Sequence, residues 1–384
     1  MYAARLAAAL RAHWPEVRFF GAAGPRLREQ GVEMVVDSAS LAVVGLAEVV
    51  SHLPRIYREY RKLIRAARVD PPDLAILTDS PDFHLRLARQ LKRMGVPVFY
   101  LVAPQVWAWR QGRLRAIRER VDKLFCLFPF EEPWFRERGV DATYIGHPLA
   151  STVRPTHSRE EFFAAHQLDP AAQTLVLLPG SRAGEARRHL PALLGAVEIL
   201  WRQFPQLQVV LATPKTLQPR IAFASFWERF SALSIQVIEG EAWDCLAYAS
   251  LALAASGTVT VEAAVLGTPL VTFYKVTPLS WWAGRRLVKV PYLSMVNLIA
   301  GRMLAPELMQ DDMTAESIAA AATPLLQDPA AANAMREGLA EIRRAISREG
   351  DPFERAAGLI VRGHPGILKK DHEVSRKDAK GAKD

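Results

Sequence analysis

The sequence predicts an α/β protein with two doubly wound domains that face a cleft. The chain has 384 residues, half of them hydrophobic, so it is long enough to bury two cores. Short β-branched or aromatic runs alternate with helical patterns, which is typical of parallel sheets covered by helices on both faces. Prolines and small polar residues interrupt this alternation near residues 150 to 158, where we expect the junction between the domains.

The strand candidates fall on both sides of that junction. In the first half they are VRFF (17–20), LAILT (74–78), VFYLV (98–102) and LFCLF (124–128). In the second half they are TLVLL (174–178), QVVLA (208–212), SIQVI (234–238), LALAA (251–255) and LVTFY (270–274). Helical patterns fill the intervals, so the strands of each sheet are expected to be parallel.

This order of elements divides the chain. We expect an N-terminal Rossmann-like domain over residues 1–152 and a C-terminal one over residues 153–345. Residues 346–365 are expected to form a helix that packs back on the N-terminal domain, and residues 366–384 a disordered basic tail. The chain opens on MYAARLAAALRAHWP, whose apolar face is interrupted by Arg5 and Arg11, so it reads as an amphipathic helix and not as an export signal.

Composition limits the classes of function. Cys126 and Cys245 both lie in apolar runs without metal-ligand or disulfide spacing, and we interpret them as buried thiols of a reducing compartment. The formal net charge is +9, which favours an anionic partner such as a phosphorylated substrate or lipid head groups. The sequence has no nucleic-acid-binding signature and no apolar run long enough to span a bilayer, so neither role is expected.

The stretch LLPGSRAGEARRHLP (177–191) reads as a strand, a tight turn and a helix. Gly180 permits the turn, Ser181 can cap the helix, and Arg182 can bind phosphate through two parallel hydrogen bonds. The alternative is a well-capped helix with a solvated arginine. No GxxxxGK[ST] phosphate loop is present, so ATP hydrolysis is not expected.

The stretch LAASGTVTVEAAVLGTPLV (253–271) repeats that arrangement. Ser256, Gly257 and Thr258 come where backbone N–H groups and the positive end of a helix dipole could bind a diphosphate. Glu262 follows one helical turn later, close enough to accept hydrogen bonds from a ribose. Its alternative role is that of a favourable acidic residue in the first turn of a helix.

The first domain has its own polar stretch. Asp79 and Asp82 follow a strand, and Pro81 constrains the turn between them, so Asp82 could remove a proton from a substrate hydroxyl or cap a helix. Trp107 and Trp109 are expected to end the next strand facing the cleft, lining the path of an apolar substrate, or else to be core residues.

A membrane contact is predicted between residues 41 and 69. An apolar surface gives way there to five basic residues, as in a helix that lies in the bilayer interface; the alternative is a buried helix. The apolar residues are Val43, Val44, Leu46, Val49, Val50, Leu53 and Ile56. The basic residues are Arg55, Arg58, Arg61, Lys62 and Arg65.

Seven stretches together resemble the lipid-A-disaccharide synthase family, inverting glycosyltransferases of the two-Rossmann-domain B type. They are TDSPDFHLRLARQLK (78–92), APQVWAWRQGRLRAI (103–117), PFE (129–131), IGHPL (145–149), LLPGSRAGE (177–185), ASGTVTVEA (255–263) and VNLIAGRMLAPELMQ (296–310). They run in order from about residue 19 to about residue 345. Other B-type transferases share a turn such as SGT but not the whole series.

The resemblance implies the reaction and the roles. UDP-2,3-diacylglucosamine donates its sugar to the 6-hydroxyl of 2,3-diacylglucosamine 1-phosphate, which forms a β-1,6 disaccharide and releases UDP. Asp82 would be the base, Arg182 would bind donor phosphate, Glu262 the donor ribose, and Asn297 the substrate. The alternative for Asn297 is a loop or helix-cap role. Arg110 and Arg113 would stay near phosphate. No metal or other cofactor is implied.

The resemblance also sets expectations about place and partners. It implies a cytoplasmic protein bound peripherally to the cytoplasmic face of the inner membrane, and the sequence is compatible with a homodimer. The family begins with a strand and a GEASGD-type turn, which this sequence lacks, so a sheet edge is expected to be unpaired and part of the active-site rim absent. Two departures are His84, where the family usually has asparagine, and Met295-Val296, where it has Leu-Pro.

Two other readings remain open. One is a different B-type UDP-sugar enzyme, such as an epimerase or a peptidoglycan glycosyltransferase. The other is an inactive lipid-binding scaffold.

Overall fold

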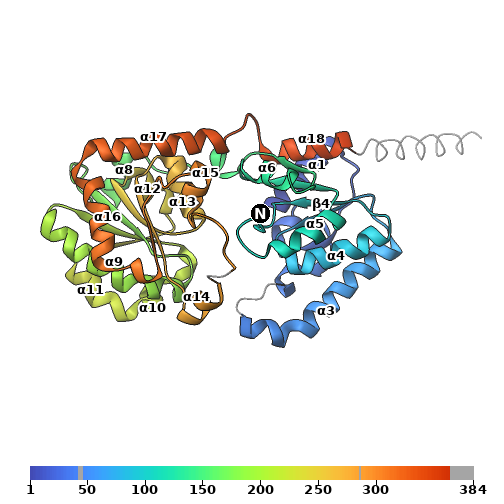
Figure 1. The fold of residues 1–384 in the computed structure, drawn as a ribbon, viewed down its shortest axis with the longest axis horizontal. Helices are drawn as coiled ribbons and strands as arrows, with labels where there is room; N and C mark the ends of the chain where they lie inside the picture. Colours follow the sequence, from blue (N-terminus) through green and yellow to red (C-terminus); the bar gives the residue numbers. More distant parts are fainter. Residues whose placement is uncertain (42–45, 285–286, 364–384) are drawn as a thin grey trace, which may run out of the picture. The chain divides into compact units, whose positions relative to one another are not determined.

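The computed structural model describes residues 1–41, 46–284 and 287–363, and these divide into two compact units (Figure 1). Unit 1 comprises residues 1–146 together with the segment from Arg348, and unit 2 comprises His147–Ser347. The junction therefore lies six residues before the predicted boundary at 152/153. The last helix belongs to unit 1, and the predicted tail at 366–384 lies outside the described residues.

Unit 1 contains two separate parallel sheets. A two-stranded sheet pairs β1 (Phe20–Ala23) with β2 (Glu33–Asp37). A four-stranded sheet has the order β3 (Ala75–Thr78), β4 (Val98–Leu101), β5 (Lys123–Cys126) and β6 (Ala142–Tyr144). Among the described residues β1 pairs only with β2 and β3 only with β4, so an edge of each strand has no ladder partner. A Rossmann sheet is continuous across this position, and the expectation of an unpaired edge fits the break.

Helices pack against both sheets of unit 1. They are α1 (Tyr2–His13), α2 (Pro25–Arg28), α3 (Leu46–Val69), α4 (Pro81–Arg93), α5 (Leu114–Arg120), α6 (Glu131–Arg136) and α18 (Pro352–Gly363), with 3₁₀ turns η1 (Ser38–Leu41) and η2 (Gln111–Arg113). Alternate residues of β4 and β5, such as Phe99 and Phe125, share one hydrophobic cluster with α1 and α18. Tyr100 points to the opposite face, where its ring lies near His84 of α4.

Unit 2 is a doubly wound domain. Its six parallel strands have the order β12-β11-β10-β7-β8-β9. Their bounds are β7 (Thr174–Leu178), β8 (Gln208–Thr213), β9 (Gln236–Glu239), β10 (Leu251–Ala255), β11 (Leu270–Tyr274) and β12 (Glu307–Met309). The chain lays down β7, β8 and β9 in one direction and then returns to place β10 beside β7, so the strand order reverses between these two central strands.

Helices cover both faces of this sheet. They are α7 (Leu149–Thr152), α8 (Arg159–Ala165), α9 (Ala183–Gln203), α10 (Pro219–Ala222), α11 (Trp227–Ala232), α12 (Ala242–Tyr248), α13 (Thr258–Leu266), α14 (Pro278–Gly284), α15 (Met295–Ala300), α16 (Ala315–Gln327) and α17 (Pro329–Ile346), with 3₁₀ turns η3 (Lys215–Leu217), η4 (Ala224–Phe226) and η5 (Gln310–Asp312). In Figure 1, α9 and α16 pack together on one face, whereas α12 and α13 lie on the other. No helix within the described ranges is both long and apolar enough to cross a bilayer.

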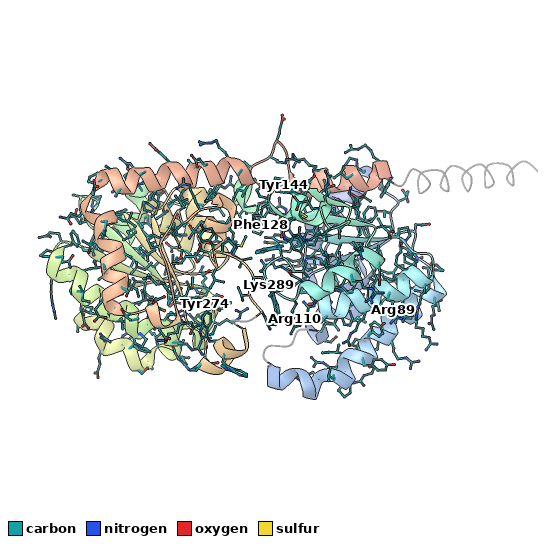
Figure 2. The ribbon with its side chains drawn as sticks, viewed as in Figure 1. Arg89, Arg110, Phe128, Tyr144, Tyr274 and Lys289 are labelled. Atoms are coloured by element: carbon teal, nitrogen blue, oxygen red, sulfur yellow. The ribbon has the colours of Figure 1, made fainter. Side chains whose placement is uncertain are left out.

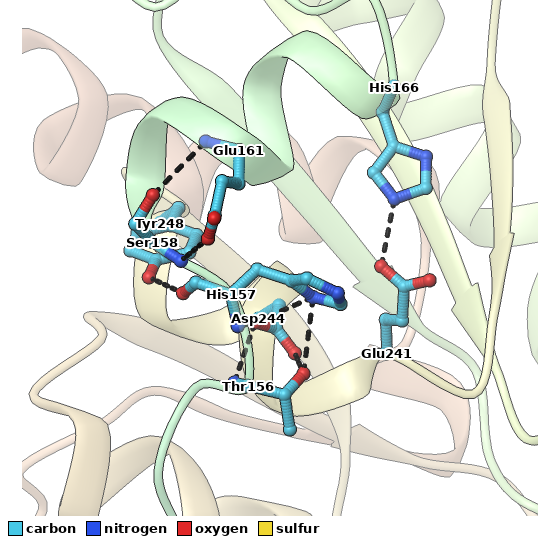
Figure 3. Close-up of polar contacts among 8 residues, drawn as sticks. All are labelled: Thr156, His157, Ser158, Glu161, His166, Glu241, Asp244 and Tyr248. Carbon is cyan, nitrogen blue, oxygen red and sulfur yellow. Dashed lines mark hydrogen bonds and ion pairs between the residues drawn. The ribbon is translucent and has the colours of Figure 1, made fainter.

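The segment after the junction is fixed to unit 2 by Asp244 of α12 (Figure 3). This buried carboxylate accepts hydrogen bonds from the backbone N–H groups of Thr156 and His157 at 2.8 Å and from the Thr156 hydroxyl at 2.7 Å. Ser158 and Glu161 form a capping box at the start of α8. These contacts explain why the proline-rich segment folds with unit 2 instead of separating the units.

Every predicted strand run overlaps an observed strand, although VRFF overlaps β1 only at Phe20. Sequence patterns missed β2, β6 and β12. These strands are short or have partly exposed side chains, as in the sequence Glu-Met-Val-Val-Asp of β2, so they lack the apolar runs that identify buried strands.

Candidate functional site

A strained turn follows β3 in unit 1. Asp79 and Ser80 both have positive φ angles, +60° and +40°, which are uncommon for residues with side chains. The carbonyl of Asp79 accepts hydrogen bonds from the Tyr100 hydroxyl and from Nδ1 of His84, the latter at 2.7 Å. Burial lowers the pKa of His84, so the neutral ring is its donor form. The turn is thus held by the buried side chain of Tyr100 and by the partly buried side chain of His84.

Asp82 stands at the second position of α4 and is ion-paired. One carboxylate oxygen lies 3.2 Å from Nη1 of Arg110, and the other contacts Arg113. The guanidinium groups also lie over the ring of Trp109, at 4.6 Å for Arg110 and 5.6 Å for Arg113. Arg110 is labelled in Figure 2. We call these four residues the Asp82 cluster; its carboxylate is 71% exposed, so solvent or a ligand can reach it.

The two tryptophans differ in their surroundings. Trp107 is buried, its Nε1 donates to Glu131 at 3.0 Å, and its ring packs edge-on against Phe130. Trp109 is 40% exposed. Both lie in the turn beyond β4, which ends at Leu101, so the prediction that they end a strand is wrong. Trp107 has the alternative role of a core tryptophan, because its only polar atom is already bonded inside the unit.

A cavity of about 270 Å³ opens beside these residues, at the carboxyl ends of β3, β4 and β5. Its walls include Asp79, Tyr100, Trp109, Arg113 and Glu131. Burial raises the pKa of Glu131 to about 7, although three N–H donors hold its carboxylate. Sequence analysis did not single out Tyr100 or Glu131. Only the PFE motif pointed toward Glu131.

In unit 2, the turns after β7 and β10 lie side by side. These strands pair directly, with Leu178 opposite Ala254, so the turns flank the point at which the strand order reverses. Open α/β sheets bind ligands at the carboxyl ends of the strands at such a point. Two turns that the sequence predicted separately as phosphate sites therefore form one candidate site.

The turn after β7 depends on Gly180. Its φ is +122°, and a Cβ there would lie 2.5 Å from a carboxylate oxygen of Glu185. Arg182 is exposed, and no ion pair engages it within the described part of the chain. The prediction that Ser181 caps the helix is wrong. The N-cap of α9 is Arg182, and no side chain bonds to the cap.

The sequence analysis predicted no role for His189, yet its side chain holds this turn through hydrogen bonds. It is fully buried, its Nδ1 donates to the carbonyl of Pro179 at 2.7 Å, and its Nε2 accepts from the N–H of Lys275 at 3.0 Å. Burial lowers the pKa of His189, in keeping with this neutral tautomer. The ring ties the turn after β7 to the end of β11. A single histidine on an apolar helix face is not enough to predict that its side chain joins two turns.

The turn after β10 presents Ser256, Gly257 and Thr258 at the start of α13. Gly257 is the N-cap without a side-chain cap bond, and the first amides of a helix have no carbonyl partner one turn earlier. The Ser256 hydroxyl donates to the carbonyl of Leu293 at 3.0 Å. Glu262 is bonded to the Trp243 side chain, and burial raises its pKa. Its carboxylate is therefore already held by one donor.

Asn297 is fully buried in α15, and its amide group is fully engaged. Its Oδ1 accepts from the N–H groups of Leu304 and Ala305, and its Nδ2 donates to the carbonyl of Ala305 and to Glu307. A direct contact with substrate would require these bonds to break. These hydrogen bonds show that Asn297 holds the loop between α15 and β12.

The predicted membrane residues are described only in part. Val43 and Val44 lie outside the described residues, and Leu46, Val49 and Val50 are described only as part of the α3 backbone. Leu53 is 50% exposed and Tyr57 60% exposed on the same helix. Across the described ranges, His, Cys, Asp and Glu side chains form no cluster of three or more that could hold a metal.

Comparison with known proteins identifies relatives along most of the chain. A model of the family described as lipid-A-disaccharide synthetase matches residues 1–351. A lipid-A-disaccharide synthase from Solibacter usitatus is 56% identical over 360 residues, which cover 94% of this chain and 93% of that protein.

Solved structures with the same fold are more distant in sequence. A putative UDP-N-acetylglucosamine 2-epimerase from Listeria monocytogenes has a TM-score of 0.59 and 15% identity, over 95% of this chain and 93% of that one. The glycotransferase of kitacinnamycin has a TM-score of 0.56 and 18% identity, over 94% of each chain. At this identity the likeness concerns the fold alone, and it confirms the predicted B-type fold class.

Proposed function

This chain belongs to the lipid-A-disaccharide synthase family, glycosyltransferases of lipid A synthesis, and we propose how its residues perform the transfer. The donor is UDP-2,3-diacylglucosamine and the acceptor is 2,3-diacylglucosamine 1-phosphate. The observation that carries the donor assignment is the pairing of β7 with β10, which sets two candidate phosphate turns side by side. Such a point of strand reversal suits a nucleoside diphosphate.

On the donor side, Arg182 binds the diphosphate together with Ser181, Ser256, Gly257 and Thr258. The exposed guanidinium and the first amides of α13 carry positive charge, which stabilises the UDP leaving group as its negative charge develops. Glu262 accepts a hydrogen bond from the ribose while it keeps the bond to Trp243. Asn297 acts indirectly, as a positioning residue for the loop before β12.

On the acceptor side, the Asp82 cluster supplies both base and phosphate binding. Both carboxylate oxygens of Asp82 are ion-paired in the structure, one with Arg110 and the other with Arg113. We propose that the 1-phosphate of the acceptor draws Arg110 and Arg113 toward itself. Binding of the correct acceptor thus releases Asp82, while Trp109 packs against the acyl-bearing sugar.

The chemical step is a single displacement with inversion. Asp82 takes the proton of the acceptor 6-hydroxyl, whose oxygen forms a bond to C1 of the donor sugar. The bond from C1 to the diphosphate oxygen breaks, and UDP leaves with the electron pair. The base and the leaving-group site act in one displacement, so no covalent intermediate with the protein is required.

Substrates with acyl chains must be drawn from a bilayer, and α3 is the proposed contact. Leu53 and Tyr57 are exposed beside the basic residues of that helix, as in a helix lying at an interface. The predicted residues Val43, Val44, Leu46, Val49 and Val50 remain part of this proposal. We propose the cytoplasmic face of the inner membrane as the location, as the resemblance to the family implies.

The test is UDP release in detergent micelles that contain the donor, with and without the acceptor. We expect release only with acceptor. An epimerase would show no requirement for the acceptor, and an inactive scaffold would release no UDP. Asp82→Asn should lower kcat on the order of 100-fold or more, because proton transfer is lost. Asp70→Asn is the matched control, since Asp70 is also an exposed carboxylate paired with an arginine, Arg18. Equal activity of both variants would remove Asp82 from the mechanism.

A further inference from the structure

A second cavity lies between α4 and α5 of unit 1, and its walls are mostly cationic. Its volume is about 580 Å³, and its lining residues are Arg89, Lys92, Arg93, Gly112, Arg115, Ala116, Glu119 and Arg120. None of them lines the cavity at the strand ends. Figure 2 shows Arg89 well apart from Arg110 of the Asp82 cluster. We call this cavity the basic groove.

The cations of the basic groove come from two helices. Arg89, Lys92 and Arg93 are spaced three and four residues apart, so they share one face of α4. Basic residues in the last turn of a helix also interact favourably with its dipole, which would explain them without a ligand. That explanation does not extend to Arg115, which lies at the start of α5, where a cation is unfavourable.

The carboxylates nearby neutralise only part of this charge. Lys92 pairs with Asp122 at 2.5 Å, and Arg115 pairs with Glu119 at 2.6 Å. Arg120 donates to the carbonyl of Leu85 at 3.0 Å, which fixes its guanidinium without cancelling its charge.

Arg89 and Arg93 are exposed, and within the described ranges no carboxylate pairs with either. Two unpaired guanidinium groups and one anchored one therefore face the basic groove. Planar guanidinium groups match the oxygens of phosphate through parallel hydrogen bonds.

We propose that the basic groove binds the phosphate head groups of anionic lipids. Its position supports a bilayer as the source, because α4 packs against α3, the helix that exposes Leu53 and Tyr57 beside basic residues. On these neighbouring helices, the apolar side chains would contact the acyl chains of a membrane leaflet and the arginines would contact its phosphate head groups. The assignment of a lipid as the ligand rests on the proposed membrane contact of α3. The basic groove itself plays no part in sugar transfer.

The experiment is flotation of the full chain with phosphatidylcholine vesicles, with and without phosphatidylglycerol, at near-physiological salt. Arg89→Gln/Arg93→Gln is compared with Arg26→Gln/Arg28→Gln, which removes the same charge from exposed positions on α2. We expect the groove variant to lower partitioning onto anionic vesicles about fivefold per cation, roughly 25-fold in all. The α2 variant should lower it less than about twofold, because charges away from the surface are screened.

Three outcomes would overturn the proposal. Equal losses in the two double variants would assign the effect to net charge, and unchanged partitioning of the groove variant would remove the groove from membrane binding. Titration with inorganic phosphate tests a soluble ligand. Phosphate binding that needs Arg89 and Arg93, with vesicle partitioning unaffected, would overturn the lipid assignment. Leu53→Asp separates the two proposals, since it should weaken binding to neutral and anionic vesicles alike and leave the phosphate titration unchanged.

Discussion

Glu131 illustrates how one buried residue can carry much of the pH response of unit 1. Its carboxylate accepts hydrogen bonds from the Trp107 indole and from the N–H groups of Leu127 and Phe128. Burial outweighs these bonds and raises the pKa of Glu131 to about 7. The native state therefore binds a proton that the unfolded state releases between the ordinary pKa of glutamate and about 7.

Stability of unit 1 should accordingly fall as the pH rises through that window, and level off above it. The raised pKa corresponds to about 3 kcal/mol. Glu131→Gln should abolish this dependence and cost about 1–3 kcal/mol at low pH, since an amide cannot accept from all three donors. Urea unfolding at pH 5 and pH 8, followed by tryptophan fluorescence, measures both effects. Glu137→Gln, at an exposed position, is the control, and an identical pH response in the two variants would contradict the assignment.

Single residues mark the limit of what the sequence can predict. Trp107 and Trp109 are two positions apart in the same motif, yet one is buried against Glu131 and the other lies exposed under two arginines. Residue type indicates the chemistry that a side chain can perform, and the predicted roles of Asp82 and Arg182 rest on it. Which side chain is already bonded inside the fold, as Asn297 is, depends on segments distant in the chain or on loop geometry, which residue patterns do not contain.

At the level of elements, the break between β1 and β3 should increase amide hydrogen exchange in these two strands. β4 is paired on both sides, whereas β1 and β3 each have a ladder partner on one side only among the described strands. Amides at an unpaired edge open to water without breaking a ladder.

We expect peptides covering Phe20–Ala23 and Ala75–Thr78 to exchange on the order of 100-fold faster than the peptide covering Val98–Leu101. Hydrogen exchange read by mass spectrometry checks this. β10 of unit 2, which is paired with both β7 and β11, serves as a second protected reference. Equal protection of β3 and β4 would show that the edge of β3 is covered.

Strands were predictable where burial is strong. β7, β10 and β11 match their predicted runs at both ends, because all or nearly all of their side chains are buried and apolar runs reveal them. These residue patterns did not predict the order of the strands in the sheet. The return of β10 to the side of β7 brings together two turns that the sequence predicted separately as phosphate sites, and it depends on how the whole sheet is wound.

At the level of the whole molecule, unit 1 is built from both ends of the chain. Phe353, Ala356, Ala357 and Ile360 of α18 are buried in the same cluster as Leu6 and Leu10 of α1. A chain that ends after Ser347 lacks all four. It should lose on the order of 5 kcal/mol of stability in unit 1, comparable with the total for a small domain.

Limited proteolysis should therefore cleave unit 1 of the shortened chain first and leave unit 2 resistant. A chain that ends after Gly363 keeps α18 and should resist like the full chain. Equal resistance of all three chains would show that α18 adds little to unit 1.

The same discontinuity bears on biosynthesis. The residues of α18 are synthesised after every residue of unit 2 and leave the ribosome after them, so unit 2 can complete its core before unit 1 receives Phe353 and Ile360. Domains usually fold in the order of their synthesis. Here unit 1 is synthesised first but completes its core last. The apolar face of α1 must therefore avoid non-native contacts until α18 has been synthesised.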